Sequence, residues 1–579
     1  MAFISPATVL GYCLGRRPGL QGALHSWTNS RSLRGVDDCE EPDPPPGSPR
    51  DGADRSIVEA IKTLRSSSCK TSAEAKLMLA VRASPPAVVH RWLLQIFCVL
   101  MESDEALEEV YRLSGEAALS LLGLAQIVDD DRCATKLAAI DHLAPTCMEL
   151  VRQLGEISTH LATLPFARRK EVLEWRLRKV KLSTGTWLGD DGTWRTLRGL
   201  DLPRCFLLSE WSSSTPFHVC LSLEESCSSI EENTGIALVG TSSEGVLYPR
   251  SLLSLAAPRR SRKSTMVNTA EHTTERRRMT TSVSKRPSGW TKEVSRSVPS
   301  GGVASLVAKA GSMSILQEQL ALSMISWMRS CWLECPQGTL ERSLGAAVRL
   351  YRVLCTSSGG VVEAVPNAVS LDSLKKAYGD TWVSLSAHFE DRWPGEEGEA
   401  ALDKFCSSMA AYSVICYVLG VRDRHNANIL LCDDGSICHV DFGFFLTNSP
   451  GNVAFEPSLK LTEELVETLG GEDSRRFGVF RRMVVRGCMV LRRDIDTLKS
   501  MIELLFPPLP ETNGWWLGPR LPCLSQGLPH TLLQMDQRLR LELSEHAFKD
   551  YLLDLVDRSV ANWRSRWYDR YQRYFGGIL

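Results

Sequence analysis

The chain has 579 residues, of which 43% are hydrophobic and 23% charged, and its formal net charge at pH 7 is −1. These values are typical of a globular protein, and the length predicts about three or four domain-sized units. The balanced charge excludes the strongly basic surface of a nucleic-acid-binding protein, so no nucleic-acid partner is expected. No apolar run reaches the ~18 residues that a helix needs to span a bilayer.

Residues 1–54 are expected to form a disordered tail and linker. The segment 36–54 is acidic and rich in proline, a composition typical of linkers. The arginines and serines before Asp37 also fit an organelle transit peptide, but a disordered tail is the preferred interpretation. The 18 cysteines lack paired zinc-ligand spacings, which predicts reduced thiols in a cytoplasmic protein.

Residues 55–170 are predicted to form an all-helical accessory domain. The segments 72–83, 87–103 and 105–128 place apolar residues at helical spacing, and turn-like breaks separate them. No residue pattern in this region indicates chemistry.

Residues 171–365 are predicted to form a strand-rich lobe with a long insertion. The segments 204–211 and 212–225 read as strands, the second because apolar and polar residues alternate in it. Residues 226–300 are expected to be a disordered basic insertion. Within it, the span 259–296 holds eleven Lys and Arg against three Glu. The insertion could touch anionic lipid or be a solvated loop without function.

After the insertion, residues 303–311 are predicted to contain a strand that ends at Lys309. A helix follows, and then a strand pair at 351–357 and 360–366. Residues 366–579 are expected to be mostly helical apart from one hairpin. A strand-rich part followed by a helix-rich part predicts an α+β catalytic unit of two lobes, preceded by the all-α domain.

A hairpin is the sharpest structural prediction in the chain. The apolar runs 429–432 and 437–440 flank Asp434-Gly435, a dipeptide that favours two-residue hairpin loops. With those two residues as the loop, Asp433 pairs with Ser436.

The same register places Asn428 opposite Asp441 at the open end of the hairpin. Opposed side chains of a strand pair have Cβ atoms roughly 4.5–5.5 Å apart. An amide oxygen and a carboxylate at that separation could share one hard cation, and Mg²⁺ prefers such ligands. The hairpin therefore predicts a magnesium site.

Groups suited to proton transfer precede this site. Asp423 and His425 stand on the loop that leads into Asn428, and either could accept a proton from an attacking hydroxyl. Phosphoryl transfer also needs a cation on the nucleotide phosphates, and Lys309 could supply it.

The motif DRHNAN at 423–428, followed by DFG at 441–443, resembles the phosphoinositide 3-/4-kinase superfamily. Protein kinases instead have H-R-D with four residues before Asn. The resemblance implies a bilobal, protein-kinase-like lipid kinase that uses ATP and Mg²⁺, with Mn²⁺ as an alternative metal. The implied roles are catalysis for Asp423 and His425, metal binding for Asn428 and Asp441, and phosphate binding for Lys309.

The resemblance extends to the expected nucleotide site. It implies a phosphate-binding loop at 212–219, an acidic partner for the lysine on the following helix, and a hinge at 360–365 that offers backbone groups to adenine. The residues implied to contact or support ATP are Ser212, Ser213, Ser214, Lys309, Glu318, Tyr351, Glu363 and Val365.

Within the superfamily, the chain most resembles the type III phosphatidylinositol 4-kinases of the beta class. The segments 365–376, 441–452 and 568–579 carry this likeness, whereas 455–462 has the spacing of the alpha class. The activation segment holds one basic residue, Lys460, which is therefore the candidate substrate contact. A single cation favours phosphatidylinositol without ring phosphates. A phosphatidylinositol 3-kinase is the alternative, since some also lack a basic cluster there.

One stretch departs from the family pattern. Residues 311–318 read GSMSILQE where the family usually has GDDLRQE, so both acids and the arginine are missing. A catalytically impaired pseudokinase or adaptor is therefore a second alternative.

The expected partner is phosphatidylinositol in a membrane surface, with peripheral association. The segment 562–575 mixes Arg with Trp and Tyr, which is typical of a membrane interface or of a helix packed on the C-lobe. The resemblance also allows small-GTPase or adaptor proteins as partners and a cytoplasmic, Golgi-like location on intracellular membranes.

Overall fold

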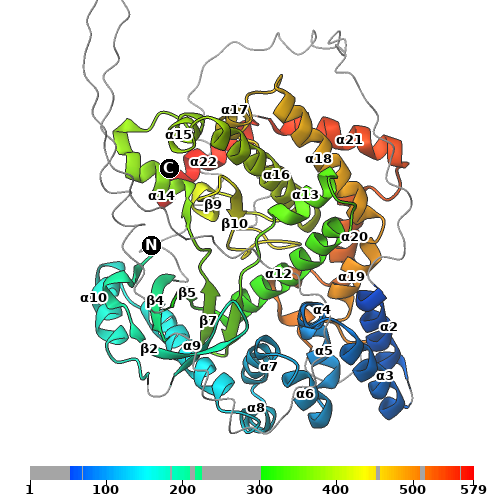
Figure 1. Cartoon of the computed structure of the whole chain (residues 1–579). Helices are drawn as coiled ribbons and strands as arrows, with labels where there is room; N and C mark the ends of the chain where they lie inside the picture. Colours follow the sequence, from blue (N-terminus) through cyan, green and yellow to red (C-terminus); the bar gives the residue numbers. More distant parts are fainter. Residues whose placement is uncertain are drawn as a thin grey trace, which may run out of the picture. The chain divides into compact units, whose positions relative to one another are not determined.

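The structure is a computed structural model (Figure 1). It describes residues 52–67, 69–182, 185–208, 215–224, 302–450, 457–508, 516–560 and 562–579. These residues belong to one compact unit. Three predictions lie outside the described residues: the tail before residue 52, the loop serines Ser212, Ser213 and Ser214, and the basic insertion 226–300.

The first part of the unit is helical, as predicted. Several of its helices begin at side-chain caps. Ser114 Oγ accepts from Ala117 N–H, and Asp130 Oδ1 accepts from Cys133 N–H. The helices are α2 (Gly52–Ser66), α3 (Lys70–Ala83), α4 (Pro86–Arg91), α5 (Leu93–Leu100), α6 (Asp104–Tyr111), α7 (Gly115–Val128), α8 (Asp131–Ala138), α9 (Leu143–Ala162) and α10 (Phe166–Leu177). The helices extend a few residues beyond the predicted bounds 55–170, since α2 starts at Gly52 and α10 ends at Leu177.

The N-lobe is built on an antiparallel sheet of seven strands. The strands are β1 (Thr186–Leu188), β2 (Trp194–Leu200), β3 (Phe206–Leu207), β4 (Phe217–Leu223), β5 (Val303–Lys309), β6 (Val353–Thr356) and β7 (Gly359–Glu363). Their order is β1-β2-β4-β5-β7-β6, with β3 paired to β4. The predicted strands around 217–223, 303–309 and 351–363 are confirmed, because alternating apolar residues there supply a buried face.

The sheet is covered by helices that precede its strands in the sequence and by one helix that lies between β5 and β6. Helix α9 packs on β5, β6 and β7 (Figure 1), and α7 packs on β6. The helix α12 (Ser312–Leu333), which follows β5, also packs on β6 and β7. The approach of α7 is close, since a Cβ on Gly123 would lie 2.2 Å from the carbonyl oxygen of Cys355. The accessory helices are thus part of the support of the N-lobe.

The C-lobe is mostly helical, as predicted. Its elements are α13 (Leu340–Ala347), α14 (Leu371–Tyr378), α15 (Leu385–Arg392), α16 (Glu396–Leu419), α17 (Glu463–Thr468), α18 (Arg475–Arg492), α19 (Ile495–Glu503), α20 (Leu528–Leu539), α21 (Glu545–Ser559) and α22 (Trp563–Gly576). Helix α16 is apolar almost all round after its first turns, and α13, α18 and α20 pack against it.

The predicted hairpin exists as β9 (Ile429–Cys432) and β10 (Ile437–His439). A third strand that the sequence analysis missed, β8 (Ala368–Ser370), pairs with β9. At three residues, β8 is too short to show an apolar alternation.

The predicted register of the hairpin is wrong by one residue. Ile437 pairs with Leu431, and Cys432 N–H donates to the Ser436 carbonyl at 2.8 Å, so the loop has three residues. Gly435 ends this loop with φ +87°, which is the common geometry of a type I turn followed by a left-handed residue. Asn428 therefore lies opposite Val440, whose N–H donates to the Asn428 carbonyl, and Asp441 comes one position later.

Two absences apply to the described residues alone. No helix among them is long and apolar enough to cross a membrane. All cysteines in the described ranges are free thiols, as predicted, and most are buried.

Candidate active site

The predicted site residues meet where the two lobes join. The end of β5 and the start of α12 come from the N-lobe, and the β9–β10 hairpin with its flanking loops comes from the C-lobe (Figure 1). Residues more than 100 positions apart in the sequence are brought together here.

Lys309 at the end of β5 is held by two carboxylates. Its Nζ donates to Glu318 Oε2 at 3.0 Å and lies 3.5 Å from Asp441 Oδ2. Tyr351 OH donates to Glu318 Oε1 at 2.9 Å, which orients the carboxylate toward the lysine. The arrangement forms although residues 311–318 depart from the family pattern, because the register of α12 still brings Glu318 to the lysine.

Burial and charge set the protonation of this cluster. Burial lowers the pKa of Lys309, but the carboxylates of Asp441 and Glu318 outweigh it and hold the pKa above its usual range. Lys309 in turn keeps the pKa of Asp441 below the usual value, with help from Arg424. Lys309 is thus a permanent cation beside an ionised Asp441.

The catalytic-loop residues Asp423 and His425 are adjacent. His425 Nε2 lies 3.8 Å from Asp423 Oδ2, and His425 Nδ1 is buried without a hydrogen-bond partner in the described structure. Burial lowers the pKa of His425, and the nearby Asp423 only partly offsets it, so the imidazole is neutral at physiological pH. A neutral imidazole with an open nitrogen can accept a proton.

Asp423 and Asp441 share an uncommon backbone conformation, each with φ +62°. For residues other than glycine this left-handed conformation costs free energy and is concentrated at functional sites. Arg424 supports it: the guanidinium donates from Nη1 to the Val440 carbonyl at 2.8 Å and from Nη2 to the Asp441 carbonyl. Sequence analysis assigned no role to Arg424, although it lies inside the recognised motif.

The oxygen ligands fit a hard divalent cation. Asn428 Nδ2 donates to the Asp423 carbonyl at 2.9 Å, so its amide oxygen is the atom that could bind metal. The Asp441 carboxylate is ionised and its side chain is 48% exposed. No cluster of three or more His, Cys, Asp or Glu side chains suited to a metal occurs in the described ranges. Mg²⁺ is typically bound by one or two protein oxygens, and phosphates of the nucleotide complete its coordination.

Gln317, which with Glu318 resembles the family's helix motif after the lysine, joins three parts of the site. Its Nε2 donates to the Gly443 carbonyl at 2.6 Å, and its Oε1 accepts from Cys523 N–H at 2.8 Å. This places α12 against the segment that follows Asp441. The position of Gln317 directly before Glu318 could have suggested that its amide has a structural role. The partners of that amide lie over 100 residues away in the sequence, so the sequence does not identify them.

The predicted hinge lies at the end of β7. Glu363 N–H donates to the Arg352 carbonyl, and the Glu363 carboxylate accepts from Arg352 N–H at 3.3 Å. Neither bond uses the Glu363 carbonyl oxygen, which could meet an adenine amino group. Val365 is partly buried against the core two residues later.

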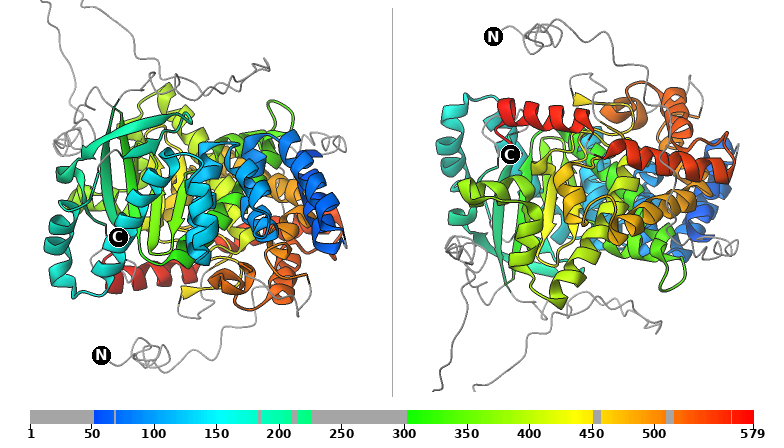
Figure 2. Two further views of the ribbon diagram at one scale, coloured as in Figure 1. Left: turned by 90° about the horizontal axis from the view of Figure 1, so that it is seen from below. Right: turned by 90° about the horizontal axis from the view of Figure 1, so that it is seen from above.

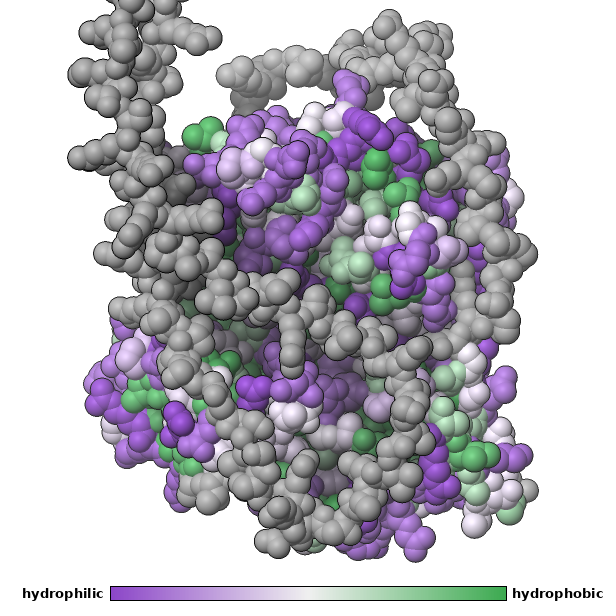
Figure 3. Space-filling view, in the orientation of Figure 1, coloured by the Kyte–Doolittle hydropathy of each residue, from purple (hydrophilic) through white to green (hydrophobic). Residues whose placement is uncertain are grey.

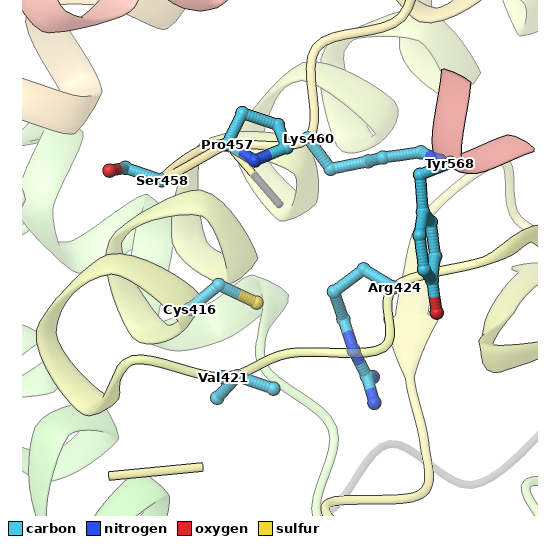
Figure 4. Close-up of a pocket in the computed structure, with 7 residues that line it drawn as sticks. All are labelled: Cys416, Val421, Arg424, Pro457, Ser458, Lys460 and Tyr568. Atoms are coloured by element: carbon cyan, nitrogen blue, oxygen red, sulfur yellow. The ribbon is translucent and has the colours of Figure 1, made fainter. Parts of the chain in front are cut away.

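Lys460, the predicted substrate contact, pairs with Asp569 of α22. It lines a small pocket with Arg424, Pro457 and Tyr568, and Figure 4 shows its side chain extending toward Tyr568. Its side chain is 9% exposed. Lys460 thus lies beside the catalytic loop, with its charge already partnered.

Two further residues on α22 contact Asp423, the predicted catalytic aspartate. Tyr568 OH donates to Asp423 Oδ1, and Gln572 Nε2 lies 3.4 Å from the same oxygen. At the end of the chain, Asn426 Nδ2 donates to the Leu579 carbonyl at 2.5 Å. Nothing local in the sequence indicated these contacts, which join positions about 145 residues apart.

The comparison with protein families addresses the same residues. The family model described as phosphatidylinositol 3- and 4-kinase matches residues 311–512. This span includes Glu318, Asp423, His425, Asn428 and Asp441. Residues 311–512 are therefore similar to the kinase domain that this family model describes. The match starts two residues after Lys309, so the place of Lys309 in the kinase site rests on its contacts with Glu318 and Asp441.

Curated relatives of this kinase domain agree with the predicted resemblance. "Phosphatidylinositol 4-kinase" of Dictyostelium discoideum is 35% identical over 285 residues, covering 48% of this chain and 22% of that protein. "Phosphatidylinositol 4-kinase beta 1" of Arabidopsis thaliana is 34% identical over 290 residues (49% and 24%). "Phosphatidylinositol 4-kinase beta" of Sorex araneus is 31% identical over 287 residues (49% and 33%). The chain thus matches a third or less of the length of each of these relatives.

Proposed function

We propose that this chain is an ATP-dependent lipid kinase that phosphorylates phosphatidylinositol at the inositol 4-hydroxyl. The observation that carries the proposal is the position of Lys309 between Glu318 and Asp441, together with the bond between Asn428 and Asp423 on the loop before Asp441. This set supplies a phosphate-binding cation, metal-binding oxygens and a proton acceptor, the three requirements of phosphoryl transfer. It argues against the adaptor alternative.

Each residue has a distinct part in the proposed reaction. Lys309 binds phosphate oxygens of ATP, and Asn428 and Asp441 hold Mg²⁺, or Mn²⁺ in its place. The metal, when bound, neutralises charge on the phosphates. Asp423 and His425 orient the inositol hydroxyl and accept its proton as its oxygen bonds to the γ-phosphorus and the bond to ADP breaks.

The adenine would lie along the hinge, at Glu363 and Val365. Tyr351 has an indirect role, because it holds Glu318 rather than any substrate atom. We propose the loop serines Ser212, Ser213 and Ser214 as phosphate contacts on the resemblance alone. Lys460 would meet the lipid headgroup once it separates from Asp569.

The choice of the 4-position rests on the names of the relatives, since the matched family model covers 3- and 4-kinases alike. The same relatives motivate the proposal of peripheral association with intracellular, Golgi-like membranes and of small-GTPase or adaptor partners. The domain division at residue 365 also remains a proposal, and it falls between β7 and β8.

The test is a radiolabelled-ATP assay on phosphatidylinositol vesicles, with the product resolved as the 3- or 4-phosphate. Wild type is expected to give the 4-phosphate, and Asp441→Asn to lower the rate at least about 100-fold because it removes the anionic ligand proposed to hold the metal ion at the phosphates. Asp473→Asn, on an exposed loop of the C-lobe, is the matched control and should retain activity.

Other outcomes revise the proposal in defined ways. A 3-phosphate product would keep the mechanism and change the position. If wild type unfolds cooperatively on heating, and is therefore folded, but gives no labelled product, the kinase assignment is overturned. A rise in thermal stability with Mg-ATP would then separate a nucleotide-binding adaptor from one that binds none.

A further inference from the structure

The outward face of α10 combines exposed cations with an exposed tryptophan. Leu173 and Leu177 are buried and fix which side of the helix faces the N-lobe. Arg168, Trp175 and Lys179 lie seven and four residues apart, so they share the opposite side. The Trp175 side chain is 53% exposed, although tryptophan is usually among the most buried residues.

The charge of this face is strongly unbalanced. The exposed cations of α10 and the turn that follows are Arg168, Lys170, Arg178, Lys179 and Lys181, against the exposed acids Glu171 and Glu174. None of these cations forms an ion pair with a carboxylate in the part of the chain that the structure describes. The neighbouring helix α9 differs, because its Arg152 pairs with both Glu149 and Glu156.

The aromatic and the cations act as a unit. Lys179 Nζ lies 3.6 Å from the centre of the Trp175 ring, which keeps the ammonium group over the indole face. Strand β3, which packs on α10, adds the exposed Phe206 (52%) and Leu208 just after it (47%). Hydrophobic and hydrophilic residues lie side by side over this part of the molecule in Figure 3.

We propose that this α10 face, defined by Arg168, Trp175, Arg178 and Lys179, docks the protein onto an anionic lipid bilayer. Indole rings favour the headgroup level of a membrane, and lysine and arginine beside them meet anionic lipids. Charge complementarity excludes a basic partner. A bilayer fits better than an acidic protein, because the proposed substrate is itself an anionic membrane lipid; this choice rests on the proposed function.

The position of α10 suits a bilayer that also delivers substrate. Both views in Figure 2 place α10 and α22 toward the same end of the molecule. Helix α22 contacts Asp423 through Tyr568 and exposes Tyr571 (43%) and Tyr574 (84%). A membrane that meets α10 would therefore lie on the side from which the catalytic loop is reached.

The experiment is flotation of the full chain with two kinds of vesicle, phosphatidylcholine alone and phosphatidylcholine with phosphatidylserine, without ATP. The variant R178E/K179E reverses two charges of the face. The matched control K62E/K76E makes the same change on exposed sites of α2 and α3, which lie at the opposite side in Figure 1. W175A tests the aromatic separately.

R178E/K179E is expected to weaken binding to phosphatidylserine vesicles at least about tenfold at low salt. The weakening should be smaller at high salt, because salt screens the charges that the variant reverses. K62E/K76E should change it less than about twofold, and W175A should weaken binding at both salt concentrations. All five substituted positions are exposed, so the thermal unfolding midpoint of each variant should stay within a few degrees of wild type.

Equal binding by R178E/K179E and wild type, or an equal loss in the control, would overturn the proposal and leave α10 to an acidic protein partner or to solvent. The readout requires no catalysis. A wild type that binds vesicles through α10 yet makes no product would refute the proposed function and keep this inference. Normal phosphorylation of detergent-dispersed phosphatidylinositol by R178E/K179E would show that the active site is intact.

Discussion

Glu363 at the end of β7 illustrates how one side chain responds to its surroundings. Burial and the nearby Asp190 raise the pKa of its carboxyl to about 7 from a usual value of 4.5, although Arg352 acts in the opposite direction. A carboxyl whose folded pKa exceeds its unfolded pKa takes up a proton on folding between those two values. Its contribution to stability is complete below pH 4.5 and is lost as the pH rises through 7.

We therefore predict that Glu363→Gln flattens the pH dependence of stability. Between pH 4.5 and 7, the unfolding free energy of wild type should fall with a pH slope to which this group contributes about one bound proton. The variant should lack this contribution to the slope. The measurement is the thermal unfolding midpoint across this range. Glu390→Gln, an exposed position on α15, is the control. Identical slopes for wild type and Glu363→Gln would contradict the prediction.

At the scale of elements, α22 and the catalytic loop are one functional unit. Tyr568 OH and Gln572 Nε2 both approach Asp423 Oδ1, and Gln572 also donates to Tyr568 OH at 2.6 Å. In the proposed reaction, the acceptor hydroxyl donates to the same carboxylate. The tyrosine thus competes with the acceptor.

Tyr568→Phe should raise basal ATP hydrolysis, in which water is the acceptor, by about tenfold to a hundredfold, because hydrogen bonds to charged groups are worth about 1.5–3 kcal/mol. The assay measures phosphate release without vesicles. Tyr574→Phe on the same helix, with a side chain that is 84% exposed, is the control. A fall in hydrolysis would mean that Tyr568 positions Asp423 for catalysis instead.

At the scale of the whole molecule, the accessory helices and the two lobes are packed into one unit. Gln95 Nε2 on α5 donates to the Met501 carbonyl on α19 at 2.6 Å, which connects the accessory helices to the C-lobe. On the N-lobe side, α7 approaches β6 at Gly123, where only a hydrogen faces the Cys355 carbonyl.

Gly123→Ala should lower the thermal unfolding midpoint of the whole chain. The new Cβ would lie 2.2 Å from a backbone oxygen, which cannot move away as a flexible side chain could, so we expect a cost of about 1–3 kcal/mol. Gly52→Ala at the start of α2, where no atom lies within 4 Å of the added Cβ, is the matched control. Equal midpoints would show that α7 is loosely docked on β6.

The sequence by itself indicated the family that residues 311–512 match and most local structure. The motif at 423–428 with the DFG at 441–443 led to the family, and the matched domain agrees. Helices and strands followed from apolar spacing, because their faces pack against a core whatever its detailed shape. The Lys309–Glu318 contact was expected from the family resemblance alone, and the structure contains it.

Tertiary structure decided what depends on distant contacts. The hairpin register shifted by one residue, because Gly435 takes a left-handed conformation within a three-residue loop. Tyr568 and Gln572 at Asp423, Asp569 at Lys460, and the Gln317 bonds to Gly443 and Cys523 join segments over 100 residues apart. Their pairing depends on how whole elements dock, and no local propensity or spacing records that geometry.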